Sequence, residues 1–563
     1  MKTTKTFSFH WGIPGWNSTS GLSLWPILFL AIALLFFCHP SVAAGQADSL
    51  KFRFIYNNDG TEILGNRWHQ FRPLTIDDVH SYVDILADGG VTTFMICTGS
   101  TLVYYDSKIE RPLGLDRDGN LSDDCSEKKL GEDLQSFGRN YLALKEQGTD
   151  IVTLCVNRAK EKGMEAFITM RMNDLHFTDP NLTCPPAQSS LWLDHSEWRL
   201  GDHPGWHADG ALNFAHPGVR QYKLNLIREQ CERFAIDGIE LDFMRFIVYF
   251  PYNKGHEYLA VMTEFMQQAR TIVTEVGAKQ GRPILLAVRV PARFDLALAK
   301  GLDVAGWVNS HLVDMISISS HWLGDPALPV REFKAKLGAT SIPVYASIEC
   351  GQYNPYLFLS HGMYRATASH CLGQGADGIY LFNFSFPEYW SQPEQTSPDR
   401  FINSVRTPAL LRELSDSDRL AGRNKLYTLS DGCVEYGYRP DTPLPIFISP
   451  WDEKELELEL AENVARHLPV RALLFLRIKD PGDVIVSFNG ATVEQADHSL
   501  AATFERDKGL QGNDSVAVYS IPAKLLTNGK QLITLRSIAP RPMFLIRVEL
   551  AIEYGQVHDC GYF

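Results

Sequence analysis

The chain has 563 residues, of which 45% are hydrophobic and 21% are charged, and its formal net charge is −13. This length exceeds that of one ordinary domain, and the apolar content excludes a wholly disordered chain. Acidic and basic residues are mixed along the chain, which argues against a nucleic-acid-binding surface and makes a strongly anionic substrate less natural.

The N-terminal residues predict an export signal. Lys2 and Lys5 precede an apolar run over 24–37 (LWPILFLAIALLFF), and small residues follow up to Ala44. A bilayer span needs about 20 apolar residues, so this shorter run indicates a signal peptide over 1–44 that is cleaved near Ala44. An uncleaved anchor is the alternative. Cleavage implies a secreted or periplasmic protein that keeps no stable membrane span.

The cysteines give no sign of a structural zinc site. Of the ten, Cys38 lies within the predicted signal, and the others show no CxxC spacing. Cys125 and Cys184 lie in loop-like segments and can pair in an oxidising compartment.

Short β-branched or aromatic runs recur from residue 50 to residue 384, each followed by a loop and a helical pattern. Apolar residues at helical spacing predict helices over 150–162, 219–234 and 257–276. Strands that alternate with helices pair in parallel, and eight such units favour closure into a (β/α)8 TIM barrel, which we place over 50–415. No GxGxxG turn follows the first run, and this absence argues against a dinucleotide-binding fold. The eight runs are Phe52–Tyr56, Thr92–Cys97, Ala166–Met172, Gly238–Phe243, Ile284–Val290, Met315–Ser319, Pro343–Ile348 and Gly378–Phe382.

A different pattern follows the barrel. Prolines interrupt the chain before a helical stretch near 401–414, and short alternating runs separated by turns continue to residue 552. We expect an antiparallel β-sandwich over 425–563. The stretches 483–493 and 521–533 resemble galactose-binding-like sandwiches that are appended to glycosidases; a purely structural sandwich is the alternative.

The fourth run carries the main chemical signal, DGIELDFMR over 237–245. Alternation places Glu240 and Asp242 inside the barrel, with Asp242 nearer the end at which barrel active sites lie. Buried carboxylates are costly unless they are hydrogen-bonded or used, and Arg245 would hold one of them ionised. A structural network with Asp237 and Arg245 is the alternative.

The seventh run ends at Glu349, across the barrel mouth from the fourth. Two carboxylates so placed can flank a glycosidic bond, one as acid and the other as nucleophile or base. Alternatively, Glu349 binds a sugar hydroxyl or caps the next loop. Asp174 and Asp325 are further candidate acids. Other strand ends carry polar or aromatic residues that we predict to bind substrate: Arg171, Asn173, Arg245, Arg289, His321, Trp322 and Asn383.

An aromatic and histidine-rich insertion precedes the fourth run, with WLDH at 192–195 and WHAD at 206–209. Such loops line sugar clefts or pack on the barrel. A metal site could be formed by His207, Asp209 and His216. These residues lack HExxH spacing, so we predict no metal and no cofactor. The chain has no GxSxG turn, which argues against an esterase.

The segment FAIDGIELDFMR at 234–245, with LNFAHPGVR at 212–220 before it, resembles the glycosyl hydrolase-like 10 proteins and related bacterial TIM-barrel glycosidases. Those families share a DGI-x-x-D-x-x-R strand; the resemblance spans about 50–385 but is motif-specific only at this strand. It implies that Asp242 is an active-site acid. Glu240 stands where related strands carry His or Phe, so the division between acid and nucleophile stays open.

Together these patterns predict an exported glycoside hydrolase of poly- or oligosaccharides, with Asp242, Glu349 and Glu240 as catalytic residues. Two alternatives stay open: a non-catalytic carbohydrate-binding barrel, and a metal-dependent deacetylase on the same fold. The sequence makes no prediction of oligomeric state.

Overall fold

The computed structural model describes residues 52–65, 72–320, 328–349, 359–384, 407–429, 444–503 and 512–555. The predicted signal peptide lies outside these residues, as do His321, Trp322 and Asp325. Within these ranges, no helix is both long and apolar enough to cross a membrane.

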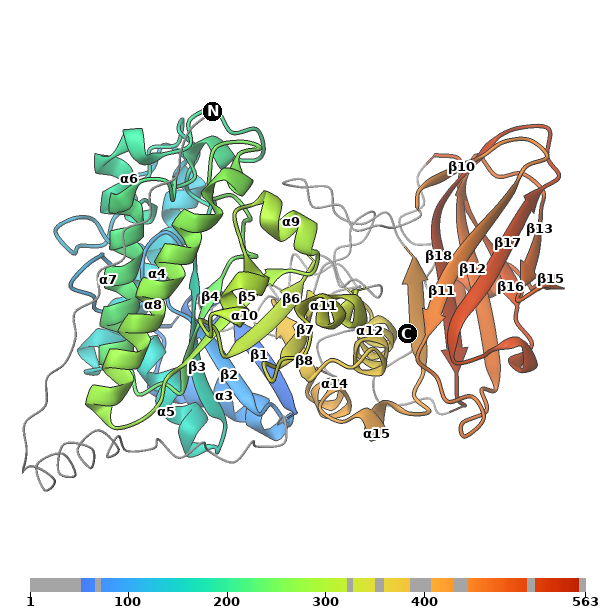
Figure 1. Ribbon diagram of the computed structural model, residues 1–563, viewed down its shortest axis with the longest axis horizontal. Coiled ribbons are helices and arrows are strands. Elements are labelled where there is room, and N and C mark those ends of the chain that lie inside the picture. Colours follow the sequence, from blue (N-terminus) through green and yellow to red (C-terminus); the bar gives the residue numbers. More distant parts are fainter. Residues whose placement is uncertain are drawn as a thin grey trace, which may run out of the picture. The chain divides into compact units, whose positions relative to one another are not determined.

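The first part is a closed barrel of eight parallel strands in chain order, in which β8 pairs with β1 (Figure 1). This confirms the predicted (β/α)8 fold, and each of the eight predicted runs overlaps one strand. The strands are β1 (Arg53–Asn58), β2 (Thr93–Cys97), β3 (Glu165–Arg171), β4 (Gly238–Asp242), β5 (Leu285–Pro291), β6 (Met315–Ser319), β7 (Val344–Glu349) and β8 (Gly378–Phe382).

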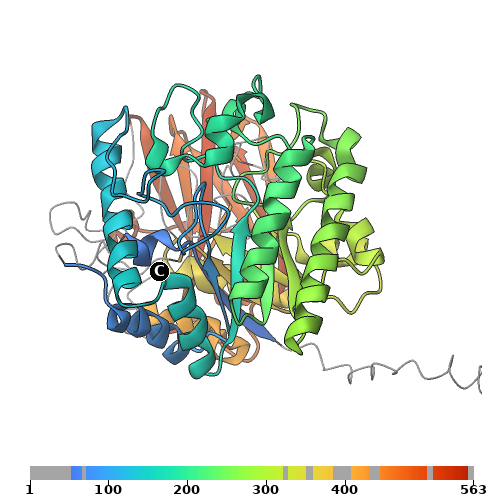
Figure 2. The same ribbon diagram turned by 90° about the vertical axis from the view of Figure 1, so that its left-hand side faces the viewer.

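Local signals in the sequence fix where the outer helices begin. Thr75 caps α3 with a reciprocal capping box to Asp78, Asp150 caps α5, and Pro217 occupies the first turn of α7. Helices α7 and α8 pack side by side outside the strands (Figure 2). The helices are α2 (Thr61–Leu64), α3 (Ile76–Asp88), α4 (Lys128–Glu146), α5 (Ile151–Glu161), α6 (Ser190–Asp194), α7 (Pro217–Arg233), α8 (Leu259–Gln280), α9 (Phe294–Ala299), α10 (Val304–Asn309), α11 (Val330–Leu337), α12 (His361–Gly373), α14 (Thr407–Leu414) and α15 (Ser417–Leu420).

The two-residue period of each strand separates an outer core from a barrel interior. On β4, Ile239 and Leu241 belong to the core that the helices cover, and Glu240 and Asp242 are buried on the opposite face, as predicted. Gly238 starts this strand because a Cβ there would lie 2.1 Å from the Phe167 ring. The apolar part of the interior is formed by Ile55, Met95, Phe167, Ala287, Met315, Tyr345, Tyr380 and Phe382.

The second part consists of two antiparallel sheets, which confirms the predicted architecture after the barrel. One sheet has the order β10-β18-β12-β16-β15, with β9 also paired to β18, and the other has the order β11-β17-β13-β14. The galactose-binding resemblance stays a prediction. The elements are β9 (Lys425–Leu429), β10 (Ile446–Ile448), β11 (Glu453–Leu460), β12 (Arg471–Lys479), β13 (Val484–Phe488), β14 (Ala491–Thr492), β15 (Glu494–Gln495), α16 (Ser499–Thr503), β16 (Asp514–Ser520), β17 (Gly529–Ser537) and β18 (Met543–Glu553).

Candidate active site

The carboxyl ends of β4, β5, β6 and β7 meet in one buried ionic cluster, which we call the Arg289 cluster: Asp242, Arg289, Ser319 and Glu349. Arg289 Nη1 lies 3.0 Å from each carboxylate oxygen of Asp242, and its Nη2 donates to Glu349 Oε1. Ser319 Oγ also donates to Glu349 Oε1, at 2.7 Å. One guanidinium therefore joins the carboxylates of β4 and β7, the two that the sequence analysis expected to face each other.

Asp242 accepts further hydrogen bonds from the chain that follows it. The backbone N–H groups of Met244 and Arg245 donate to Oδ1 at 2.8 and 3.2 Å. These amides and the guanidinium are all donors, so together they fix the orientation of the Asp242 carboxyl group. The sequence predicted that the Arg245 guanidinium would pair with one of the strand's carboxylates. In the structure, the ion pair with Asp242 is made by Arg289, on the neighbouring strand β5.

Glu349 is a buried carboxyl group at the end of β7. Burial raises the pKa of its carboxyl group, although Arg289 and Ser319 act in the opposite direction. A carboxylic acid that keeps its proton at higher pH is suited to donate that proton to a leaving group.

Glu240 lies in the barrel interior, two residues before Asp242 on the same face of β4. Its Oε1 accepts hydrogen bonds from Asn57, Thr169 and Tyr380 at 3.3, 2.9 and 2.7 Å. Burial, together with the neighbouring charge of Asp242, raises the pKa of Glu240 to about 7. These contacts make it an interior acid enclosed by protein side chains, and its predicted catalytic role stays a prediction.

A second ionic group, which we call the Arg171 cluster, lies at the ends of β1, β3 and β4: Asp59, Arg171, Asp174, His176 and Arg245. Arg171 bonds Asp174 at 2.6 Å and lies 3.5 Å from Asp59. Burial alone would raise the pKa of Asp174, but the hydrogen bond from His176 and the positive charge of Arg171 hold it well below its usual range. Both aspartates are therefore charged at neutral pH, since Arg171 likewise lowers the pKa of Asp59 against the effect of burial.

His176 is a site residue that the sequence analysis missed. Its Nδ1 bonds Asp174, and its Nε2 accepts from the Arg245 guanidinium at 2.9 Å. Burial and the charge of Arg245 lower the pKa of His176 despite the opposing effect of Asp174, so the ring is neutral at neutral pH. Its side chain is 32% exposed, far more than those of Asp242 and Glu349. The only sequence signal is its position just beyond the end of β3.

The other predicted substrate-binding residues divide into two kinds. Asn173 donates to the backbone oxygens of Leu212 and Val248 and accepts from the Leu212 N–H, so it joins two loops at the rim. Asn383 follows β8 with a φ of 52°, and its Oδ1 has no hydrogen-bond partner among the described residues. Contact of either residue with substrate stays a prediction.

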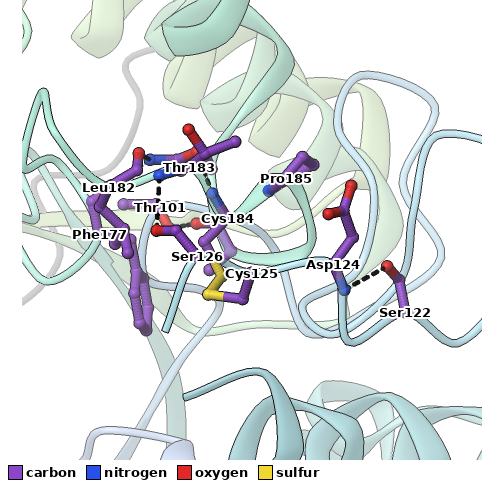
Figure 3. The surroundings of a disulfide bond; sticks show 12 residues. Thr101, Ser122, Asp124, Cys125, Ser126, Phe177, Leu182, Thr183, Cys184 and Pro185 are labelled. Carbon is purple, nitrogen blue, oxygen red and sulfur yellow. Dashed lines mark hydrogen bonds between the residues drawn. A yellow bond between two sulfur atoms is a disulfide. The ribbon is translucent and has the colours of Figure 1, made fainter. Parts of the chain in front are cut away.

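A disulfide joins Cys125, ahead of α4, to Cys184 in the insertion after β3 (Figure 3). The pairing suggested by the loop positions is therefore confirmed. Beside it, the N–H of Ser126 donates to the Thr183 oxygen, and the N–H of Thr183 donates back to Ser126 Oγ. The insertion that covers the end of β3 is thus covalently anchored to the loop after β2.

Among the described residues, no group of three or more His, Cys, Asp or Glu side chains is placed to hold a metal ion. Of the three residues considered for such a site, His207 lies 3.6 Å from Asp179, and the His216 ring stacks on Trp198. These contacts serve the packing of the insertion.

The fold and the clusters thus define a TIM barrel with buried carboxylates at its mouth. No protein-family model matches the chain, and no curated protein is significantly similar to it. Among solved structures, the PgaB (BpsB) glycoside hydrolase domain from Bordetella bronchiseptica is 10% identical, with 64% of this chain and 99% of that chain covered and a TM-score of 0.40. The endo-beta-1,4-mannanase from Thermotoga petrophila is 11% identical, with 90% and 98% covered and a TM-score of 0.43. A bacterial fucosidase is 12% identical, with 86% and 92% covered and a TM-score of 0.34. Likenesses this distant establish neither a family nor a reaction for this chain.

Proposed function

We propose that the protein is a glycoside hydrolase whose reacting groups are Asp242 and Glu349. The observation that carries the proposal is the Arg289 cluster, in which carboxylates from β4 and β7 converge at the carboxyl ends of the barrel strands on a single guanidinium. That end of a barrel is where active sites lie, and paired carboxylates are the groups that glycosidic bond cleavage requires.

The two carboxylates take different roles. Glu349, whose pKa is raised by burial, donates its proton to the glycosidic oxygen as the bond to the anomeric carbon breaks. Asp242, held by Arg289 and two backbone amides, opposes the positive charge that develops on the sugar ring. Water supplies the hydroxyl group of one product and returns a proton to Glu349, so the reaction is a hydrolysis without a redox step.

Two features support action on carbohydrate outside the cytoplasm. The N-terminal apolar run is typical of an export signal, and the Cys125–Cys184 disulfide is typical of a protein in an oxidising compartment. The proposal includes membership of the glycosyl hydrolase-like 10 or related families, which the DGIELDFMR strand resembles.

One observation favours a second candidate, a non-catalytic carbohydrate-binding barrel. Asp242 already accepts from three donors and is fully buried, which is also the arrangement of a structural ion-pair network. The two candidates differ in a single respect, because only the hydrolase turns over its ligand.

The test uses aryl glycosides with good and poor leaving groups together with plant, algal and bacterial polysaccharides. We expect Glu349→Gln to lose activity on natural sugars and on poor leaving groups by about 10²–10⁴-fold, and to retain activity on leaving groups that need no proton. Asp295→Asn is the matched control, because Asp295 is an exposed carboxylate that pairs with Arg293 on the same end of the barrel. Equal losses of Glu349→Gln on good and poor leaving groups would contradict the acid role, and sugar binding without any turnover would favour the second candidate.

A further inference from the structure

The rim of the barrel also carries two large aromatic side chains that remain about half exposed. Trp206 lies in the insertion between β3 and α7, with an exposed fraction of 47%, and Tyr252 lies in the loop between β4 and α8, with an exposed fraction of 49%. Both loops follow the carboxyl ends of strands, so both rings belong to the face on which barrel active sites are built. In Figure 1 this insertion, which also carries α6, lies at one end of the barrel.

Trp206 is held in position on its inner side. Its ring stacks on the buried Phe246 with centroids 5.8 Å apart and an interplanar angle of 28°, and the His176 ring meets it edge-on at 5.9 Å. The His207 ring also meets it edge-on at 4.2 Å, and 47% of the side chain stays exposed. Tryptophan and tyrosine rings that are apolar on one side and wet on the other are enriched at binding interfaces.

Contiguous contacts connect this ring to the proposed reacting groups. His176 bonds the guanidinium of Arg245, whose backbone N–H donates to Asp242. Tyr252 belongs to the same stretch of rim, because its ring lies edge-on at 5.2 Å to His203, three residues before Trp206.

We propose that Trp206, with Tyr252 on the loop after β4, forms a subsite that stacks on a pyranose ring of an extended polysaccharide. The apolar C–H face of the sugar covers the indole, and the Phe246 and His176 rings behind it hold the indole in place. This inference rests on the proposed function and deepens it, because the subsite is separate from the Arg289 cluster. The substrate is therefore a polymer that also occupies the rim, not a terminal sugar alone.

The test compares wild type with Trp206→Ala on a polysaccharide hit, its hexasaccharide and an aryl monoglycoside. We expect Trp206→Ala to raise KM for the polymer and the hexasaccharide about tenfold, equivalent to about 1.4 kcal/mol, and to leave kcat and the aryl monoglycoside within about twofold. Trp206→Phe restores most of the affinity because it keeps a flat ring. Phe52→Ala is the control, since Phe52 is a 37% exposed aromatic residue just before β1, at the amino end of the barrel strands.

Binding is measured separately, as retardation of each variant in native gels that contain the polysaccharides. Retardation of wild type that is lost in Trp206→Ala supports the subsite even if no polysaccharide is cleaved, in which case only the proposed function fails. Cleavage by wild type with unchanged KM and unchanged retardation in Trp206→Ala overturns the subsite alone. Failure of every polysaccharide to retard wild type also overturns it.

Discussion

Glu240 provides a test of the barrel interior that is independent of any substrate. We consider Glu240→Gln, which keeps an oxygen to accept from Thr169 and Tyr380 and removes the titrating proton. In the folded protein the pKa of Glu240 rises from 4.5 to about 7. Folding therefore favours the protonated acid, and ionising it in place costs free energy.

The magnitude follows from this difference in pKa. At about 1.4 kcal/mol for each pKa unit, ionisation of Glu240 costs the folded state roughly 3 kcal/mol. Because the folded pKa is the higher one, the contribution to stability is fully present below about pH 4.5 and is lost as the pH rises through about 7. Glutamine does not titrate, so the stability of Glu240→Gln rises relative to that of wild type over the same pH range.

The assay is thermal or urea unfolding of wild type and Glu240→Gln, followed by tryptophan fluorescence from pH 4 to pH 8. We expect the stability difference between the two proteins to move in favour of the variant by roughly 3 kcal/mol between these limits. Other groups titrate equally in both proteins and cancel in the difference. A difference that stays constant over the whole range would refute the reasoning.

Three further predictions concern the Arg289 cluster, the disulfide and metal dependence. Arg289→Met leaves Asp242 and Glu349 buried without their shared cation, so we expect a loss of roughly 3–5 kcal/mol in unfolding free energy; an unchanged melting temperature would contradict the ion-pair assignment. Cys125→Ser opens a disulfide with a sequence separation of 59 and is expected to cost up to roughly 4 kcal/mol, a loss that dithiothreitol should reproduce in wild type but not in the variant. Incubation with EDTA is expected to leave activity unchanged, because neither proposed role uses a metal; inactivation by the chelator, reversed by added Zn²⁺, would favour the deacetylase alternative.

The barrel was predictable because its signals are local. Each strand is a short β-branched or aromatic run, and the alternation in GIELD alone places Glu240 and Asp242 on the interior face. The antiparallel sheets were predictable for the same reason, because short alternating runs separated by turns indicate them.

The partners within the site were less predictable because they depend on which strands become neighbours. Arg245 follows Asp242 closely in sequence and was the expected cation, but its guanidinium turns to His176, and Arg289 on the adjacent strand pairs with Asp242. His176 was missed because only the fold brings it to Asp174 and Arg245. Side-chain pairing across a barrel mouth depends on the order and register of the strands. A sequence pattern predicts how many strands there are, but not their register.

The central claim is that Asp242 takes part in hydrolysis of a glycosidic bond. The most direct measurement compares kcat/KM of wild type and Asp242→Asn on the first substrate found to release sugar, after matched melting temperatures show that both proteins are folded. The account predicts a loss of about 10²–10⁴-fold in the variant. A loss of less than about tenfold would show that Asp242 is only a structural partner of Arg289 and would contradict the account.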